Sequence, residues 1–271
     1  MKNVFFLLLF PLLSFCQLIS YELIQTWSID DVQDVYSFSS IPSYAGEVNY
    51  QVEGYKVSYY TSDHSGNQVV ATGAIYIPIG SKCLHPVISW QHGTIVSDYS
   101  APSYQIDSGN FIGILAASHG YIVLMSDYLG LGDGDGNHNY CHSKTEASAV
   151  IDLISSSNDF FALEGVGYND QLFLMGYSQG GHATLATVRE IEESNMNNFQ
   201  ITASSPMAGP YSMSETQVEM LNAVYPNPGY FPYVISSYQN VYGNLYSNSS
   251  EIFKAGFENI LDLYDGTFSM D

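Results

Sequence analysis

The segment that most constrains the fold is a short apolar run followed at once by a glycine-rich turn and a helical run. The apolar run covers 171–175, the turn at 176–181 reads Gly-Tyr-Ser-Gln-Gly-Gly, and the helical run continues to 191. A parallel strand, a Gly-x-Ser-x-Gly turn and a helix together form a nucleophile elbow, in which the serine has a strained backbone conformation. The pattern therefore predicts that Ser178 is a catalytic nucleophile. A purely structural glycine-rich turn is the alternative.

Short apolar runs alternate with helical runs on both sides of this segment. In chain order these runs cover 86–90, 111–118, 121–125, 146–161, 171–175, 183–191 and 199–203. Strands that alternate with helices form βαβ units. Two earlier runs rich in β-branched and aromatic residues, 55–60 and 69–77, flank a turn and predict an antiparallel hairpin at a sheet edge. We therefore expect an α/β fold, a mostly parallel sheet with helices on both faces. The nucleophile elbow within it resembles that of the α/β-hydrolase fold.

The N-terminus has the layout of a secretory signal. Lys2 precedes an apolar run at 4–13, and Ser14 and Cys16 stand where small residues precede a cleavage site before Gln17. The apolar run is shorter than the roughly 20 residues that cross a bilayer. We therefore expect a signal peptide at 1–16, no stable membrane anchor, and a secreted or periplasmic protein. A lipoprotein signal that uses Cys16 is the alternative.

The charge balance argues against nucleic acid as a partner. Six Lys and Arg residues against 27 Asp and Glu residues give a formal net charge of −21. Such a surface repels phosphate backbones and anionic membranes. The length of 271 residues and the 46% hydrophobic content suit one α/β domain with a small appendage.

No metal or cofactor is predicted. Removal of the signal leaves Cys83 and Cys141, which the sequence permits to be joined or separate, and no Cys or His residues have zinc-motif spacing. The loop that begins at Asp133 starts like a calcium loop. It has His138 and Lys144 where that motif needs Gly and Glu, so it does not predict a calcium site.

The groups expected around Ser178 include donors for an oxyanion. The backbone N–H of Gln179 begins the following helix and is the first candidate donor. The loop after the strand at 86–90 is expected to supply the second, from Gly93 or Thr94. Asp127 precedes the serine in the chain, whereas this fold places its acid later, so we interpret Asp127 as structural.

The histidines raise a question about the base. All seven, at 64, 85, 92, 119, 138, 142 and 182, lie at or before His182, which follows Ser178 by four residues on a helix that carries it away from the nucleophile. This fold places the acid and the histidine after the serine. We therefore expect both groups beyond residue 271 and interpret the chain as truncated. Residues 17–210 would form the core with its N-terminal extension, and 211–271 the start of a helical cap, with helices at 215–224 and 250–264.

Several motifs together resemble one known family. They are WQHGT at 90–94, SAPSY at 100–104, SDYLGLGDG at 126–134, HNYCHSKTEASAVIDL at 138–153 and GYSQGGHA at 176–183. The combination resembles the secretory lipase family of α/β-hydrolases over about 50–211. The resemblance implies hydrolysis of small-molecule or lipid carboxylic esters through an acyl-enzyme on Ser178, with oxyanion donors at Gln179 and Thr94. A serine peptidase on the same fold and a non-catalytic binding protein that lacks a base are the alternatives.

Overall fold

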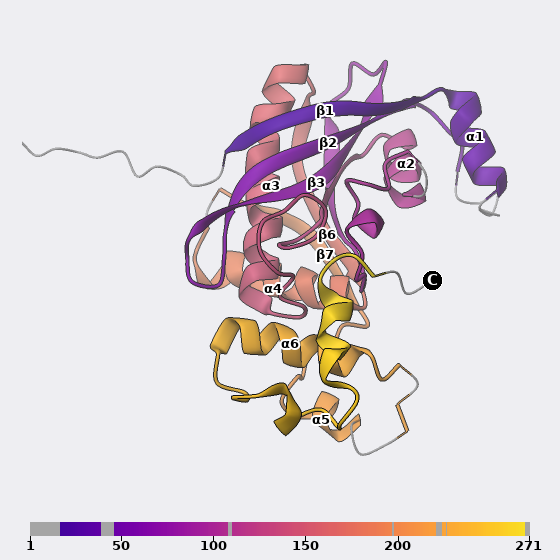
Figure 1. Cartoon of the computed structure of the whole chain (residues 1–271). Helices are drawn as coiled ribbons and strands as arrows, with labels where there is room; N and C mark the ends of the chain where they lie inside the picture. Colours follow the sequence, from indigo (N-terminus) through magenta and orange to yellow (C-terminus); the bar gives the residue numbers. More distant parts are fainter. Residues whose placement is uncertain are drawn as a thin grey trace, which may run out of the picture.

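A computed structural model of the chain describes residues 17–38, 46–107, 110–196, 198–220, 224–225 and 227–268 (Figure 1). The predicted signal peptide at 1–16 lies outside these residues. The strands are β1 (Leu18–Trp27), β2 (Gln51–Ser62), β3 (Gln68–Ile79), β4 (His85–Gln91), β5 (Ile122–Ser126), β6 (Tyr168–Tyr177) and β7 (Ile201–Met207). The α-helices are α1 (Ile29–Phe38), α2 (Phe111–Ser118), α3 (Ser143–Glu164), α4 (Gln179–Glu193), α5 (Thr216–Met220) and α6 (Tyr230–Tyr242). Short 3₁₀ helices cover Asp98–Ser100, Ser249–Glu251 and Glu258–Tyr264.

The described strands form one mixed sheet in the order β1-β2-β3-β5-β4-β6-β7. Strands β4, β5, β6 and β7 are mutually parallel where they pair, and β1, β2 and β3 join them through antiparallel pairs. Because parallel strands end at the same edge of the sheet, the loops after β4, β5 and β6 meet there. The expected α/β-hydrolase fold is confirmed.

The predicted hairpin is present, but it does not form the edge of the sheet. Strands β2 and β3 pair antiparallel from Gln51 opposite Ile79 to Ser62 opposite Gln68. Strand β1 then pairs with β2 and takes the outer position. Most β1 side chains are exposed, among them Ile19, Leu23 and Ile24, and the apolar and polar residues of the strand do not alternate regularly. This is why its sequence gave no strand signal.

Two hydrophobic clusters cover the two faces of the sheet. On one face, side chains of α3 such as Val150 and Leu153 and of α4 such as Ala183 pack against Leu124 and Leu174 of the sheet. On the other face, α1 and α2 pack against a second set of strand residues. The layer of α3 and α4 is therefore built from the two helical runs predicted at 146–161 and 183–191.

The N-terminal helix α1 begins with a side-chain cap. Asp31 Oδ2 accepts hydrogen bonds from Ser28 N at 2.8 Å and Ser28 Oγ at 2.7 Å, and Asp31 N donates back to Ser28 Oγ at 3.2 Å. Such reciprocal bonds satisfy donors that the first turn of a helix leaves free. The cap therefore fixes where α1 begins, directly after β1.

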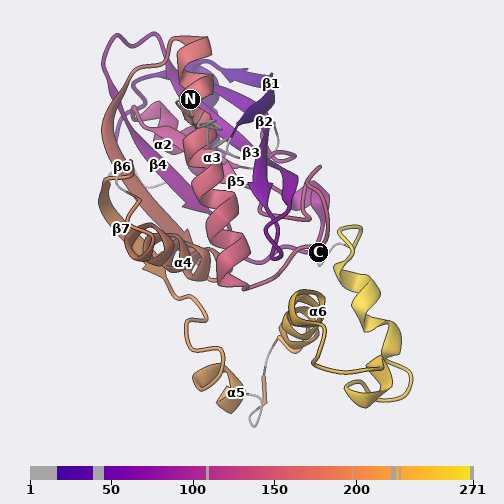
Figure 2. The same cartoon turned by 90° about the vertical axis from the view of Figure 1, so that its left-hand side faces the viewer.

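The described residues of 208–268 lie at one end of the core, and we call this segment the cap (Figures 1 and 2). The predicted helix at 215–224 appears as α5, over Thr216–Met220. The single helix predicted at 250–264 is wrong, because two 3₁₀ segments lie there and Gly256, with φ of +90°, separates them. Helix α6 was not predicted, because its tyrosines, Pro232 and polar residues do not form a clear apolar stripe.

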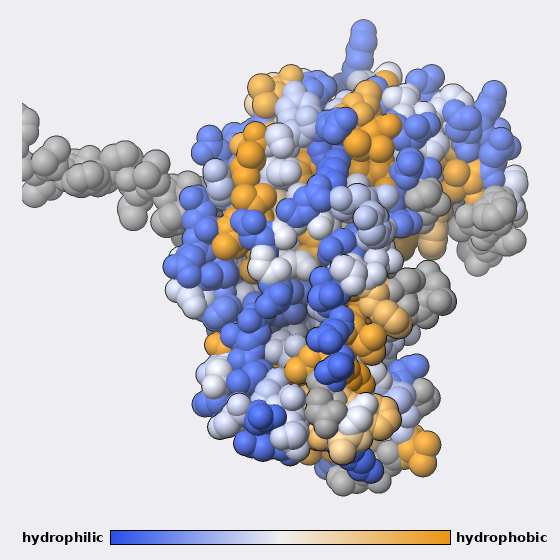
Figure 3. All heavy atoms as spheres, viewed as in Figure 1, coloured by the Kyte–Doolittle hydropathy of each residue, from blue (hydrophilic) through white to orange (hydrophobic). Residues whose placement is uncertain are grey.

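The face of the molecule seen in Figure 3 carries both hydrophilic and hydrophobic residues. Figure 3 shows a largely hydrophilic face on which hydrophobic patches are separate from one another. Several exposed hydrophobic side chains belong to the cap, among them Val218, Leu245 and Phe257. The cap is therefore less completely packed than the sheet and its two helix layers.

Candidate active site

Ser178 lies in the tight turn between β6 and α4, at the edge of the sheet where the parallel strands end. Its φ of 60° and ψ of −121° lie in a region that residues other than glycine rarely adopt. Two backbone hydrogen bonds hold the turn: Ser178 N donates to Met207 O at 3.0 Å, and His182 N donates to Ser178 O at 3.2 Å. The strained serine predicted from the sequence is therefore present, held between β7 and the first turn of α4.

Glycines allow the loop after β4 to lie directly against this turn. A Cβ atom added to Gly180 would stand 2.0 Å from Gln91 O and 2.8 Å from His92 O. On the other side of the contact, a Cβ atom added to Gly93 would stand 3.9 Å from Ser178 Cβ. The structure therefore brings Ser178 against the loop at 92–95, which we call the Gly93 loop. Gly93 and Ser178 are 85 residues apart in the sequence.

Side chains fix the conformation of the Gly93 loop. His92 Nδ1 lies 2.7 Å from Gly93 O, and the His92 ring lies against Tyr128 with ring centroids 4.3 Å apart. Tyr128 Oη donates to His92 O at 3.1 Å, and Thr94 Oγ1 is 2.8 Å from Tyr140 Oη. Burial lowers the pKa of His92, which favours the neutral ring. His92 therefore supports the loop, as a local structural role requires.

Helix α4 presents its N-terminus to the same place. Gln179 is its first residue and is fully buried. The N–H groups of the first helical turn have no acceptor within the helix, and the helix dipole favours negative charge at this end. The Gln179 backbone therefore begins a helix whose N-terminus suits an oxyanion, as the sequence predicted for its position in the elbow.

A cavity of about 500 Å³ opens at Ser178 and lies between the core and the cap. Most of its wall is apolar and comes from the cap. The lining residues include Tyr140, Cys141, Ser178, Met213, Phe231 and Val234. The serine therefore faces a space in which the apolar part of a small organic molecule fits.

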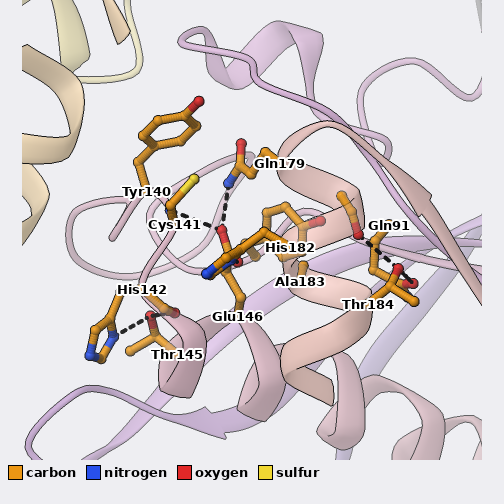
Figure 4. A network of polar contacts seen from close by, with 12 residues as sticks. Gln91, Tyr140, Cys141, His142, Thr145, Glu146, Gln179, His182, Ala183 and Thr184 are labelled. Carbon is orange, nitrogen blue, oxygen red and sulfur yellow. Dashed lines mark hydrogen bonds and ion pairs between the residues drawn. The ribbon is translucent and has the colours of Figure 1, made fainter. Parts of the chain in front are cut away.

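Beneath the turn, Glu146 of α3 is the centre of a buried polar network (Figure 4). Glu146 Oε1 accepts from Cys141 N at 3.0 Å and from Gln179 Nε2 at 2.8 Å, and Glu146 Oε2 lies 2.6 Å from His182 Nδ1. Gln179 Nε2 also lies 2.7 Å from His138 Nε2. The carboxylate thus ties α3, the segment before it and the first turns of α4 together. Sequence reasoning missed Glu146, because nothing in a helical run marks an acidic residue as buried.

The two histidines of this network have opposite pKa shifts. Burial lowers the pKa of His138 to about 4, against a smaller opposing effect of Glu146. For His182 burial also lowers the pKa, but the hydrogen-bonded Glu146 carboxylate outweighs it and the net shift is upward. His182 is therefore paired with Glu146 and not with Ser178. This agrees with the expectation that α4 carries His182 away from the nucleophile.

No described histidine is bonded to the candidate nucleophile. The ring nitrogens of His92 and His138 contact backbone carbonyls and Gln179, and His182 contacts Glu146. In the part of the chain that the structure describes, no hydrogen bond joins a histidine to Ser178 Oγ.

Cys141, Glu146 and His182 form a group whose ligand atoms lie within 4.8 Å of one another. Donor types of this kind suit a metal such as zinc. Here, however, both Glu146 oxygens already accept hydrogen bonds from the protein, and His182 Nδ1 is one of the partners. Hydrogen bonds within the protein therefore account for Cys141, Glu146 and His182 lying together.

The two cysteines that follow the predicted signal are not joined. Cys83 is exposed and Cys141 is buried, and both are free thiols.

Asp127, interpreted as structural from its position in the chain, makes structural contacts. Its carboxylate accepts from Thr72 Oγ1 at 2.6 Å and from Ser103 N at 2.9 Å, and the residue is fully buried. Burial raises the pKa of Asp127 to about 6. The carboxylate therefore connects β3, β5 and the segment after the Gly93 loop. Asp133, at the start of the calcium-like loop, is bonded to Lys56 Nζ at 2.6 Å.

Comparison with known proteins gives one family and a set of similar structures. The family model described as secretory lipase matches residues 94–194. The crystal structure of a ligand-bound form of the rice cell wall degrading esterase LipA from Xanthomonas oryzae is 26% identical, with a TM-score of 0.87. That match covers 94% of this chain and 68% of that chain. No curated protein sequence matches.

A more distant structure shows the same fold. Candida antarctica lipase A is 19% identical, with a TM-score of 0.67, and the match covers 93% of this chain and 55% of that chain. Fold and comparisons together define the chain as an α/β-hydrolase of the carboxylic ester hydrolase class. Within that class it resembles the secretory lipases, and the match over 94–194 confirms the resemblance predicted from its motifs. None of the described helices is both long and apolar enough to cross a membrane.

Proposed function

We propose that the protein is an exported serine hydrolase that cleaves carboxylic esters through an acyl-enzyme on Ser178. The observation that carries the proposal is the strained Ser178 backbone at the N-terminus of α4, with its side chain on an apolar cavity. A serine placed in this way is presented to a substrate by the backbone itself. Export rests on the signal sequence predicted at 1–16.

The reaction follows from the groups around the serine. Ser178 Oγ attacks the ester carbonyl carbon and gives its proton to a base, and the C–O bond that forms leaves a negative charge on the carbonyl oxygen. The N–H of Gln179 and a donor from Gly93 or Thr94 stabilise that charge. When the intermediate collapses, the alcohol leaves with a proton. Water then attacks the acyl-enzyme and releases the acid.

The base in this proposal is a histidine oriented by an acid, both placed after Ser178 in chain order, as α/β-hydrolases have them. His182 follows the serine but is already bonded to Glu146 on the far side of the turn. The proposal therefore does not use His182 as the base. His182 instead holds α4 against α3 through its hydrogen bond to Glu146.

The cavity suggests the kind of ester. Its wall is largely apolar, with Met213, Phe231 and Val234 among the lining residues, and its volume of about 500 Å³ is in the range of small-molecule sites. We propose that it takes the apolar acyl or alcohol part of a small-molecule or lipid ester. The net charge of −21 disfavours strongly anionic substrates.

The test is hydrolysis of p-nitrophenyl esters of increasing acyl length by the purified full-length protein. We expect Ser178→Ala to lower the rate by about 10⁴-fold or more, because the nucleophile is lost. The matched control is Ser65→Ala, since Ser65 is an exposed serine in the β2–β3 turn. Equal rates for Ser178→Ala and the control would contradict the proposal. Faster turnover of peptides than of esters would favour a peptidase, and ester binding without turnover would favour a binding protein.

A further inference from the structure

Three tyrosine rings from three separate segments form a continuous stack beside the cavity. Tyr140 precedes α3, Tyr233 belongs to α6, and Tyr264 ends the 3₁₀ helix Glu258–Tyr264. The Tyr140 and Tyr233 rings have centroids 4.4 Å apart and an interplanar angle of 3°, and Tyr233 and Tyr264 have centroids 4.4 Å apart at 14°. The stack therefore joins the core to two parts of the cap.

Two of the three hydroxyl groups end on consecutive residues of the Gly93 loop. Tyr140 Oη lies 2.8 Å from Thr94 Oγ1, and Tyr233 Oη donates to Ile95 O at 3.2 Å. The third hydroxyl, of Tyr264, donates to Gly229 O within the cap. The stack thus reaches the proposed oxyanion loop from one side, while His92 and Tyr128 support that loop from another.

Hydrogen bonds between α6 and the core fix the position of the stack. Ser237 Oγ accepts from Tyr140 N at 2.9 Å and donates to His138 O at 3.1 Å. Tyr238 Oη donates to Cys141 O at 3.1 Å. A displacement of α6 would therefore move Tyr233 and strain the backbone that carries Tyr140.

Both tyrosines are buried and keep their phenolic protons. Tyr140 is 5% and Tyr233 is 2% exposed. Burial raises the pKa of each phenol well above its usual range. Each hydroxyl therefore remains a neutral hydrogen-bonding group over the working range of pH. In Figure 4 the Tyr140 ring points away from Glu146, so it is not part of that network.

We propose that Tyr140 and Tyr233 are positioning residues that hold Thr94 and Ile95 in the conformation that receives the oxyanion, so that docking of the cap orders the oxyanion hole. The inference rests on the proposed function, in which the Gly93 loop supplies a donor. Neither tyrosine reacts with substrate. Each acts through the loop, whose placement to within about 1 Å changes rates by about 10²-fold in enzymes.

The first measurement uses methyl NMR and does not depend on activity. We would measure order parameters of the Thr94 γ2 and Ile95 δ1 methyl groups in the whole protein. Tyr140→Phe and Tyr233→Phe keep the rings and remove the hydroxyls, and we expect the Thr94 methyl to become more mobile in the first and the Ile95 methyl in the second. Tyr264→Phe is the control, because its hydroxyl contacts only the cap. Unchanged order parameters in both test variants would overturn the proposal.

The second measurement is ester hydrolysis. We expect Tyr140→Phe to lower kcat about tenfold with KM within twofold, as for an interaction that serves the transition state. Tyr264→Phe is expected to keep the wild-type kcat. In a Thr94→Val background the Tyr140→Phe change should have no further effect, because the partner is already absent. Full additivity of the two changes, or an equal loss in Tyr264→Phe, would contradict positioning through Thr94.

The two measurements separate the inference from the proposed function. An enzyme that hydrolyses esters equally well with Ser178→Ala would refute the proposed function, whatever the methyl groups show. An active enzyme with a normal dependence on Ser178, but with unchanged kcat and unchanged methyl mobility in both tyrosine variants, would refute the positioning role alone. Ordered methyl groups that loosen in step with a falling kcat would support both.

Discussion

The core and the cap meet at one cavity but are held together by different forces. In the core, backbone atoms in close contact fix the position of Ser178: Gly180 lies against Gln91 O, and Ser178 N bonds to Met207 O. In the cap, side chains fix the position of the segment relative to the core, since Ser237 and Tyr233 are hydrogen-bonded to loops of the core. Backbone contacts tolerate almost no change, whereas side-chain contacts can be removed one at a time.

This difference matters for how the site is assembled. The proposed nucleophile, Ser178, is built into the strand–turn–helix unit, and its backbone conformation needs no contribution from the cap. The proposed oxyanion loop, in contrast, contacts both the core and the cap. We therefore expect changes in the core to destroy the fold or the site, and changes in the cap to alter rates and local stability.

The largest effect is expected from a methyl group added in the core. Gly180→Ala would place Cβ 2.0 Å from Gln91 O, which cannot move without breaking the β4–β6 pairing. We expect a loss of more than about 4 kcal/mol of stability, or failure to fold. The same change in the cap, Gly243→Ala, meets no atom within 4 Å and strains only a φ of +67°. We expect that control to lose about 1 kcal/mol. Thermal unfolding would measure both, and equal losses would contradict the comparison.

The next effect concerns the buried carboxylate beneath the turn. Glu146→Gln removes the charge that pairs with His182 and weakens the bonds to Cys141 N and Gln179. Because breaking one half of a buried pair leaves the other uncompensated, we expect a loss of about 3 kcal/mol. The control is Glu193→Gln, which breaks an exposed pair with Arg189 and should leave the unfolding curve unchanged. Denaturant titration of both variants would measure the difference.

A third prediction concerns pH. Burial lowers the pKa of His138 to about 4 in the folded protein, whereas the unfolded chain has an ordinary histidine pKa near 6.5. Between these values the unfolded state binds more protons, so stability falls as the pH is lowered from 6.5 to 4. The loss expected from this residue is about 2 to 3 kcal/mol. Wild type and His138→Gln should therefore differ in the slope of stability against pH over that interval. Parallel slopes would contradict the shift.

The smallest effect is expected where the cap is bonded to the core. Ser237→Ala leaves the N–H of Tyr140 without its partner and removes the bond to His138 O. We expect a loss of about 1 to 2 kcal/mol, localised to the cap. Limited proteolysis should cut within 208–268 sooner than in wild type and leave the core intact. Simultaneous loss of core and cap would show that the two regions unfold as one unit.

The same division explains what the sequence could predict. Strands β4 to β7 and helices α3 and α4 follow from apolar periodicity, and the position of Ser178 follows from the turn between two of them. Edge strand β1 was missed because most of its side chains face solvent. Helix α6 was missed because tyrosine and serine side chains that bond to the core hold it, and these residue types have no helical signature of their own.

The surroundings of the serine were predictable only in part. Gly93 and Thr94 could be placed near Ser178 because the order of strands in this fold is known once the elbow is recognised. Glu146, Tyr140 and Tyr233 could not, since their roles depend on contacts between segments far apart in the chain. Burial of a carboxylate within a helix leaves no mark in a single sequence.

The most direct test of the account is the intact mass of the full-length protein after reaction with a fluorophosphonate, followed by peptide mapping. The probe transfers its phosphonyl group to an activated serine and releases fluoride. The account predicts one adduct per chain, on Ser178, and none on the Ser178→Ala variant. An adduct on another serine, or none on the wild-type protein under conditions that label serine esterases, would contradict the claim that Ser178 is the nucleophile.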